Sequence, residues 1–167
     1  MTMAILRTRR RLRRLAMLAG AAAALALPMV AFAGAQVPFK AADAGTWGVG
    51  AHDCGSQLPV FVDTVGTGTH LGRYSYASEE CADLGAATFA GAFTITAANG
   101  DTLVGTYAGT FTVDAAGTIH YEQTNTVTGG SGRFAGTSGS FQVSGLAYGD
   151  GRDVQRASGR IARVAGS

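Results

Sequence analysis

Several motifs that identify common enzymes are missing from this sequence of 167 residues. Its single lysine does not follow a glycine, which excludes the phosphate-binding loop of P-loop proteins. It contains neither a Gly-x-Ser-x-Gly elbow nor a His-Glu-x-x-His zinc motif. With 3 histidines and 2 cysteines, it offers few candidates for a metal centre. We therefore expect no cofactor and no metal, and the motifs alone do not indicate an enzyme.

The first 33 residues have the pattern of a secretory signal peptide. Residues 1–14 carry six arginines and no acidic residue, and residues 15–33 are apolar and end in Ala31-Phe32-Ala33. We expect cleavage after Ala33, so that residues 34–167 form a single secreted or periplasmic domain that leaves the membrane. An uncleaved anchor is the alternative, because the apolar run is almost long enough to span a bilayer. The paired arginines leave Sec and twin-arginine export both open.

Removing that segment reverses the sign of the net charge. The full chain has a formal net charge of +2, whereas residues 34–167 hold seven basic and eleven acidic residues, a net charge of −4. Proteins that bind the phosphate backbone of nucleic acids need clustered positive charge. The mildly acidic domain therefore argues against a nucleic-acid partner.

Alternation of apolar and polar residues with period two dominates the rest of the chain. In Phe89–Ala97 and Thr102–Val113 the odd positions carry large apolar side chains or glycine, and the even positions are mostly threonine or alanine. No segment of useful length has helical periodicity. The predicted strands cover residues 39–49, 58–66, 69–78, 87–97, 102–113, 118–128, 138–147 and 153–164. Eight successive strands with short connections predict an all-β, eight-stranded antiparallel up-and-down barrel, with a β-sandwich as the alternative.

The register between the two clearest strands, Phe89–Ala97 and Thr102–Val113, can be predicted from the sequence. Asn99-Gly100 lies between them and is a strong hairpin signal. Odd positions of both strands share a face only if the loop has an odd number of residues, as in a loop of residues 98–100. This pairing sets Phe93 opposite Gly105 and Phe89 opposite Gly109, where an aromatic ring can cover a glycine.

The two cysteines are predicted to form a disulfide. If Thr67-Gly68 is a two-residue turn, paired residue numbers add up to 135, and Cys54 lies opposite Cys81. Disulfides persist in the compartments that exported proteins enter. Metal binding by His52, Asp53 and Cys54 is the alternative, but consecutive strand residues point to opposite faces.

A group of inward-facing residues is the candidate binding site. The odd positions of residues 119–127 include Gln123 and Asn125 where the neighbouring strands have large apolar residues. Buried amides need hydrogen-bond partners. Two interpretations stay open: the amides line a pocket for a small hydrophobic ligand, or they lie at a hydrated barrel mouth. The candidate cavity residues are Phe93, Tyr107, Tyr121, Gln123 and Asn125.

A second candidate is the sequence around His70. This histidine lies next to a turn, where it can simply fix the loop. Arg73 is close enough in sequence to form an anion or loop site with it. The structural interpretation is favoured. His120, on a threonine-rich face, is expected at the surface.

The segment Gly129–Phe141, "GGSGRFAGTSGSF", has glycines spaced as in a phosphate cradle. An alternating strand follows it instead of a helix, so we expect a tight connection in which Phe134 plugs the barrel end and Arg133 lies in solvent.

The same segment resembles the Gly-Gly-x-Gly-x-Phe connection of the allene oxide cyclase and dirigent barrel proteins. "NGDTLVGTYAGTF" and "GTGTHLGRY" are similar to segments of bacterial secreted relatives of that barrel. The resemblance implies an eight-stranded barrel with a central apolar cavity, often homo-oligomeric. In plant members such cavities bind reactive hydrophobic molecules and guide cyclisation or radical coupling. The plant catalytic acids and arginines have no matching positions in this sequence.

Three functions are therefore expected in order of preference. The first is binding of a small hydrophobic molecule in the barrel. The second is a structural or surface-interaction module with a filled barrel. The third is an isomerase or cyclase of the allene oxide cyclase type, which rests on analogy alone.

Overall fold

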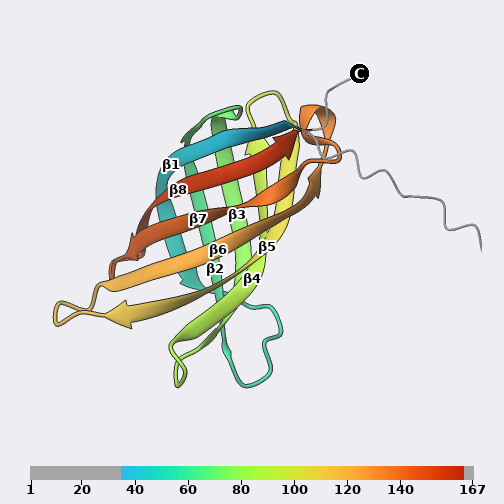
Figure 1. Cartoon of the computed structure of the whole chain (residues 1–167). Helices are drawn as coiled ribbons and strands as arrows, with labels where there is room; N and C mark the ends of the chain where they lie inside the picture. The colour runs from blue at the N-terminus through green and yellow to red at the C-terminus, as the bar shows by residue number, and fades with distance from the viewer. Residues whose placement is uncertain (1–34, 164–167) are drawn as a thin grey trace, which may run out of the picture. The chain divides into compact units, whose positions relative to one another are not determined.

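The chain folds into a closed barrel of eight antiparallel strands in up-and-down order (Figure 1). The structure is a computed structural model that describes residues 35–163. The expected signal peptide and its cleavage site lie outside these residues. The strands are β1 (Ala35–Val49), β2 (Leu58–Gly68), β3 (Gly72–Asp83), β4 (Thr88–Ala97), β5 (Thr102–Val113), β6 (Ile119–Gly130), β7 (Ser138–Ala147) and β8 (Arg152–Arg163). The predicted all-β barrel is confirmed, and the sandwich alternative is not adopted.

Pairing of the first and last strands closes the barrel. β1 pairs with β8 from Ala35↔Arg163 to Thr46↔Arg152, so no strand of the sheet is left with an unpaired edge. The alternation seen in the sequence places one set of side chains inside and the threonine-rich set outside. A short 3₁₀ helix, η1 (Gly132–Phe134), connects β6 to β7. Within the described residues no helix is long and apolar enough to cross a membrane.

The hairpin of β4 and β5 has the predicted register. Phe93 pairs with Gly105 and Phe89 pairs with Gly109. Gly100 has φ 87° and its N–H donates to the Ala97 carbonyl at 2.8 Å, which closes the loop of residues 98–100. A Cβ on Gly105 would lie 2.7 Å from the Phe93 ring. The glycine is therefore required because the aromatic ring packs directly over it.

The predicted turn between β2 and β3 is wrong. Gly68 pairs with Gly72, so residues 69–71 form the turn and Cys81 lies opposite Pro59. His70 adopts φ 64° in this turn, and Leu71 turns inward and is buried. The Cys54–Cys81 disulfide is nevertheless formed, with 5.5 Å between the Cα atoms. Cys54 reaches Cys81 from the loop after β1 and not from a paired strand.

The two ends of the barrel differ. The connections β2–β3, β4–β5 and β6–β7 lie at one end, where Phe134, Leu103, Ile161 and Phe39 are almost completely buried. We call this the closed end, and Phe134 plugs it as predicted. The connections β1–β2, β3–β4, β5–β6 and β7–β8 lie at the other end, which we call the open end.

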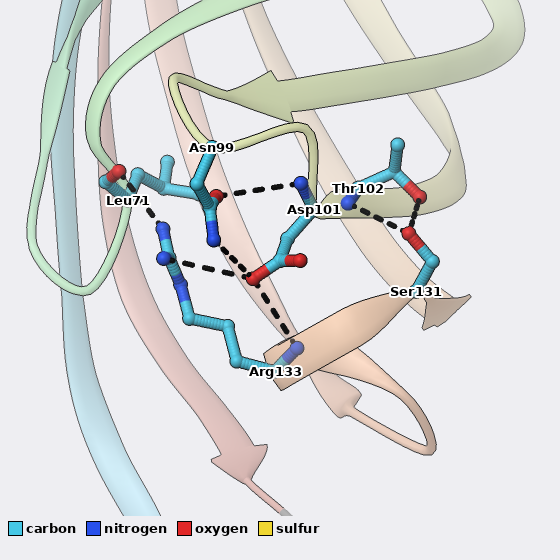
Figure 2. A network of polar contacts seen from close by, with 6 residues as sticks. All are labelled: Leu71, Asn99, Asp101, Thr102, Ser131 and Arg133. Atoms are coloured by element: carbon cyan, nitrogen blue, oxygen red, sulfur yellow. Dashed lines mark hydrogen bonds and ion pairs between the residues drawn. The ribbon is translucent and has the colours of Figure 1, made fainter.

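Arg133 is exposed, as the sequence predicts, but neighbouring residues hold its guanidinium. Its Nη2 donates to the Leu71 carbonyl at 3.1 Å, and its Nη1 lies 3.6 Å from Asp101 Oδ2 (Figure 2). Asn99 Nδ2 also donates to Asp101 Oδ2, at 2.8 Å. Gly132 has φ 55°, and a Cβ there would collide with the Asp101 carboxylate. The glycine-rich segment therefore ties η1 to the β4–β5 loop and the β2–β3 turn.

Candidate functional site

A cavity of about 120 Å³ remains inside the barrel near the open end. Strand alternation turns its wall residues inward, and most of the wall is apolar. Trp47 closes part of its rim, because the indole Nε1 donates to the Tyr148 carbonyl of the β7–β8 turn at 2.8 Å. The wall is formed by Trp47, Leu58, Val60, Val62, Tyr76, Ser78, Glu80, Ala82, Leu84, Phe89, Tyr107, Phe111, Ile119, Tyr121, Gln123, Ala147, Asp153 and Gln155.

Aromatic rings form one side of the cavity. Phe89 contacts Tyr107 edge-on with ring centroids 6.1 Å apart, and it meets Tyr121 at the same centroid distance. Such edge-to-face pairs are a favourable arrangement of aromatic rings. The rings come from β4, β5 and β6, so their positions follow from the register of three neighbouring strands.

Two carboxyl groups face the same cavity from β3 and β8, and of these Asp153 is buried and Glu80 is half-buried. Tyr107 Oη donates to Glu80 Oε2 at 2.7 Å, and Tyr121 Oη donates to both carboxylate oxygens of Asp153, at 2.9 and 3.0 Å. Burial raises the pKa of Glu80 to about 7, although the hydrogen bond from Tyr107 and the charge of His52 lower it. Burial likewise raises the pKa of Asp153 to about 7, against the lowering effect of Tyr121.

The tyrosines remain proton donors at neutral pH. Burial raises the pKa of Tyr107 and of Tyr121 above its ordinary value, and the nearby carboxylates raise it further. Each unit of the site is therefore a neutral phenol beside a carboxyl group that titrates near neutrality. Such a carboxyl group can accept a proton from a bound molecule or donate one to it. In its ionised form it can also bind a positively charged group of the ligand.

A third carboxylate lies deeper in the barrel, on β1. Asp43 accepts hydrogen bonds from Thr64 Oγ1, at 2.6 Å, and from Tyr74 Oη. Asp43 does not line the cavity near the open end. Its negative charge contributes to raising the pKa of Asp153.

The structure separates the cavity residues predicted from the sequence into two layers. Tyr107, Tyr121 and Gln123 lie on the cavity wall, whereas Phe93 and Asn125 lie outside its lining. Gln123 Nε2 donates to Asn125 Oδ1 at 2.8 Å. Asn125 is completely buried, so it does not lie at a hydrated barrel mouth.

His70 and Arg73 lie at the closed end, away from this cavity. His70 and Arg73 are both exposed. His70 Nε2 lies 3.2 Å from the Pro38 carbonyl. The contact with Pro38 gives His70 a role in fixing the β2–β3 turn. An anion site at these two residues remains a prediction.

The disulfide fixes the loop between β1 and β2 beside the open end. His52 Nε2 lies 2.9 Å from the Glu80 carbonyl on the same side. His52 and the two cysteine sulfurs lie within 4.8 Å of one another. In the disulfide the sulfurs are bonded to each other and are not thiolates, which are the form that binds metals.

Sequence reasoning missed Glu80 and Asp153 as site residues. The predicted third strand stopped at Ser78, two residues before Glu80, and carboxylates are seldom expected inside a barrel. The signal was present in the even positions of β3, where Tyr74, Tyr76 and Ser78 all face inward. Extending that alternation points Glu80 into the barrel.

Comparisons of this chain with protein-family models, curated proteins and solved structures gave no match. The functional argument therefore rests on the cavity and its residues.

Proposed function

We propose that this chain is an exported barrel protein that binds one small, mainly apolar molecule in the cavity near the open end. The observation that carries this proposal is the unfilled interior of about 120 Å³. An apolar cavity of about 150 Å³ is large enough to bind benzene. The cavity in this barrel is somewhat smaller, so it limits the ligand to a molecule of no more than about one ring.

The alternative, a structural module with a filled barrel, explains the interior less well. A void of this size costs on the order of 3 kcal/mol of stability if nothing occupies it. Burying carboxyl groups in the same place adds a further cost. Natural proteins keep such unfavourable features mainly at functional sites.

The compartment and the family are also part of this proposal. The Cys54–Cys81 disulfide is formed, which indicates folding in an oxidising environment. Export by the N-terminal segment agrees with that chemistry. The resemblance to allene oxide cyclase and dirigent barrels supports a cavity ligand, because the up-and-down barrel is the fold that the resemblance implies.

Filling the cavity is expected to abolish binding of a small apolar probe. Ala82 lines the cavity from β3, and Ala77 lies on the exposed face of the same strand. We expect toluene to bind the mature wild-type domain and the Ala77→Leu variant, with a change in the fluorescence of Trp47. The Ala82→Leu variant should bind at least tenfold more weakly, a difference of about 1.4 kcal/mol. Equal binding by both variants, or no binding by the wild type, contradicts the proposal.

A further inference from the structure

The charged groups inside the barrel all have the same sign. Glu80 and Asp153 line the cavity, and Asp43 lies deeper. None of the lysine or arginine side chains in residues 35–162 lines the cavity, and all of them belong to exposed residues. The cavity lining therefore holds acidic groups and no basic one. His52, whose charge lowers the pKa of Glu80, lies outside the lining beside the Glu80 carbonyl.

The tyrosines satisfy the hydrogen bonds of these carboxyl groups but not their charge. Tyr107 and Tyr121 donate to Glu80 and Asp153 as neutral phenols. Burying a charge is costly unless it is both hydrogen-bonded and paired with an opposite charge. When both groups ionise, the cavity consequently holds negative charge that no side chain of its lining neutralises.

A second observation points to a polar group on the ligand. Ser78 faces the cavity from β3 with only 6% of its surface exposed. Its Oγ makes no hydrogen bond of good geometry within the described residues, although Ser78 is close enough to the hydroxyl groups of Tyr76 and Tyr107 to lower their pKa. An unpaired buried hydroxyl costs about 1–3 kcal/mol. A donor on the bound molecule would satisfy it.

The remaining wall suits an organic cation better than a metal ion. Calcium takes six to eight oxygen ligands and magnesium needs six, whereas most of this wall is hydrocarbon. Faces of Trp, Tyr and Phe attract organic cations through the ring quadrupole. Trp47, Tyr76 and Phe111 surround the cavity together with the rings already described.

We propose that the ligand carries a positively charged nitrogen on a compact apolar body, with the nitrogen held between Glu80 and Asp153 and the body packed against the aromatic wall. This inference rests on the proposed binding function and adds the chemical class of the ligand. A protonated amine would also supply N–H donors for Ser78 Oγ.

The test compares two probes of nearly equal shape, benzylamine and toluene, on the mature domain at about pH 8.5, where carboxyl groups with a pKa near 7 are ionised. We expect benzylamine to bind the wild type at least tenfold more tightly than toluene. Glu80→Gln and Asp153→Asn should each lose most of this preference while still binding toluene. The matched control is Glu79→Gln, because Glu79 precedes Glu80 on β3 and is exposed.

The outcomes separate the two proposals. Equal or tighter binding of toluene by the wild type overturns the inference about charge and leaves the apolar binding site intact. Loss of the preference in Glu79→Gln also overturns it, because the effect would then come from the overall charge of the domain. Failure of both probes to bind overturns the proposed function itself.

Discussion

Raising the pH from about 5 to about 8.5 is expected to lower the free energy of unfolding of the mature domain by several kcal/mol. The reason is that Glu80 and Asp153 each have a pKa raised to about 7 in the folded barrel, from ordinary values of 4.5 and 3.8. The folded state therefore holds more protons than the unfolded state in this range. The stability that these groups contribute is complete below about pH 4 and is lost as the pH rises through about 7.

The size of the effect follows from the two pKa shifts. One pKa unit corresponds to about 1.4 kcal/mol. About two units lie between pH 5 and a pKa of about 7, so each carboxyl group contributes up to about 3 kcal/mol to the change in this interval. The two groups also repel each other when both are ionised, since Glu80 is among the causes that raise the pKa of Asp153. Partial access of water to the cavity reduces the sum, which leaves several kcal/mol for the pair.

Exposed acidic residues do not obscure this result. Hydrogen bonds from neighbouring side chains lower the pKa of Asp101, Asp114 and Asp150. Groups with a lowered pKa contribute stability that is lost only as the pH falls below about 4. Their effect therefore lies outside the interval from about pH 5 to about pH 8.5.

Urea unfolding followed by the fluorescence of Trp47 measures this prediction. The double variant Glu80→Gln/Asp153→Asn should unfold at nearly the same urea concentration at both pH values. Glu79→Gln should keep the wild-type dependence, because this neighbouring glutamate is exposed. A wild-type domain that is equally stable or more stable at the higher pH contradicts the burial of these carboxyl groups.

Replacing Phe134 by alanine is expected to cost about 4 kcal/mol of stability, within the range of about 3–5 kcal/mol for buried aromatic residues. Phe134 has no exposed surface and plugs the closed end from η1. The guanidinium of Arg133 lies 4.9 Å from the centre of its ring. The substitution therefore removes core packing and also the cation–π contact between Arg133 and the Phe134 ring.

A matched substitution on the outer face of the barrel distinguishes the effect of losing the Phe134 plug from the effect of losing an aromatic ring elsewhere. Phe61 lies on the outer face of β2, where its ring covers Gly48. Phe61→Ala should cost about 1 kcal/mol, because its ring is only partly buried. Urea unfolding at a single pH gives both values. A similar loss in the two variants would mean that the closed end is not a packed floor.

Much of the barrel could be predicted because alternation and glycine placement are local signals. The Phe93↔Gly105 pairing follows from one hairpin loop and the shared face of two strands. The predicted β2–β3 register was wrong because His70 takes positive φ, a conformation that is uncommon for non-glycine residues, in a three-residue turn. A shift in turn length moves every later pairing in the hairpin.

The candidate site was only partly predictable, because its charged residues break the usual preference for exposed carboxylates. Tyr107, Tyr121 and Gln123 were found from alternation, whereas Glu80 and Asp153 depend on strand ends, which are the least certain part of a sequence-based assignment. The contacts of Arg133 could not be predicted, because its partners, Leu71 and Asp101, come from two other connections. Only the folded barrel brings these segments together.

Native mass spectrometry of the mature domain, purified from its natural host, tests the central claim most directly. Wild type and the Ala77→Leu variant should each carry a bound small molecule that is lost on denaturation, with a mass that identifies its class. The cavity-filled variant Ala82→Leu should show the mass of the bare chain. The bare mass for all three proteins, or the same adduct on all three, would contradict a ligand in the barrel cavity.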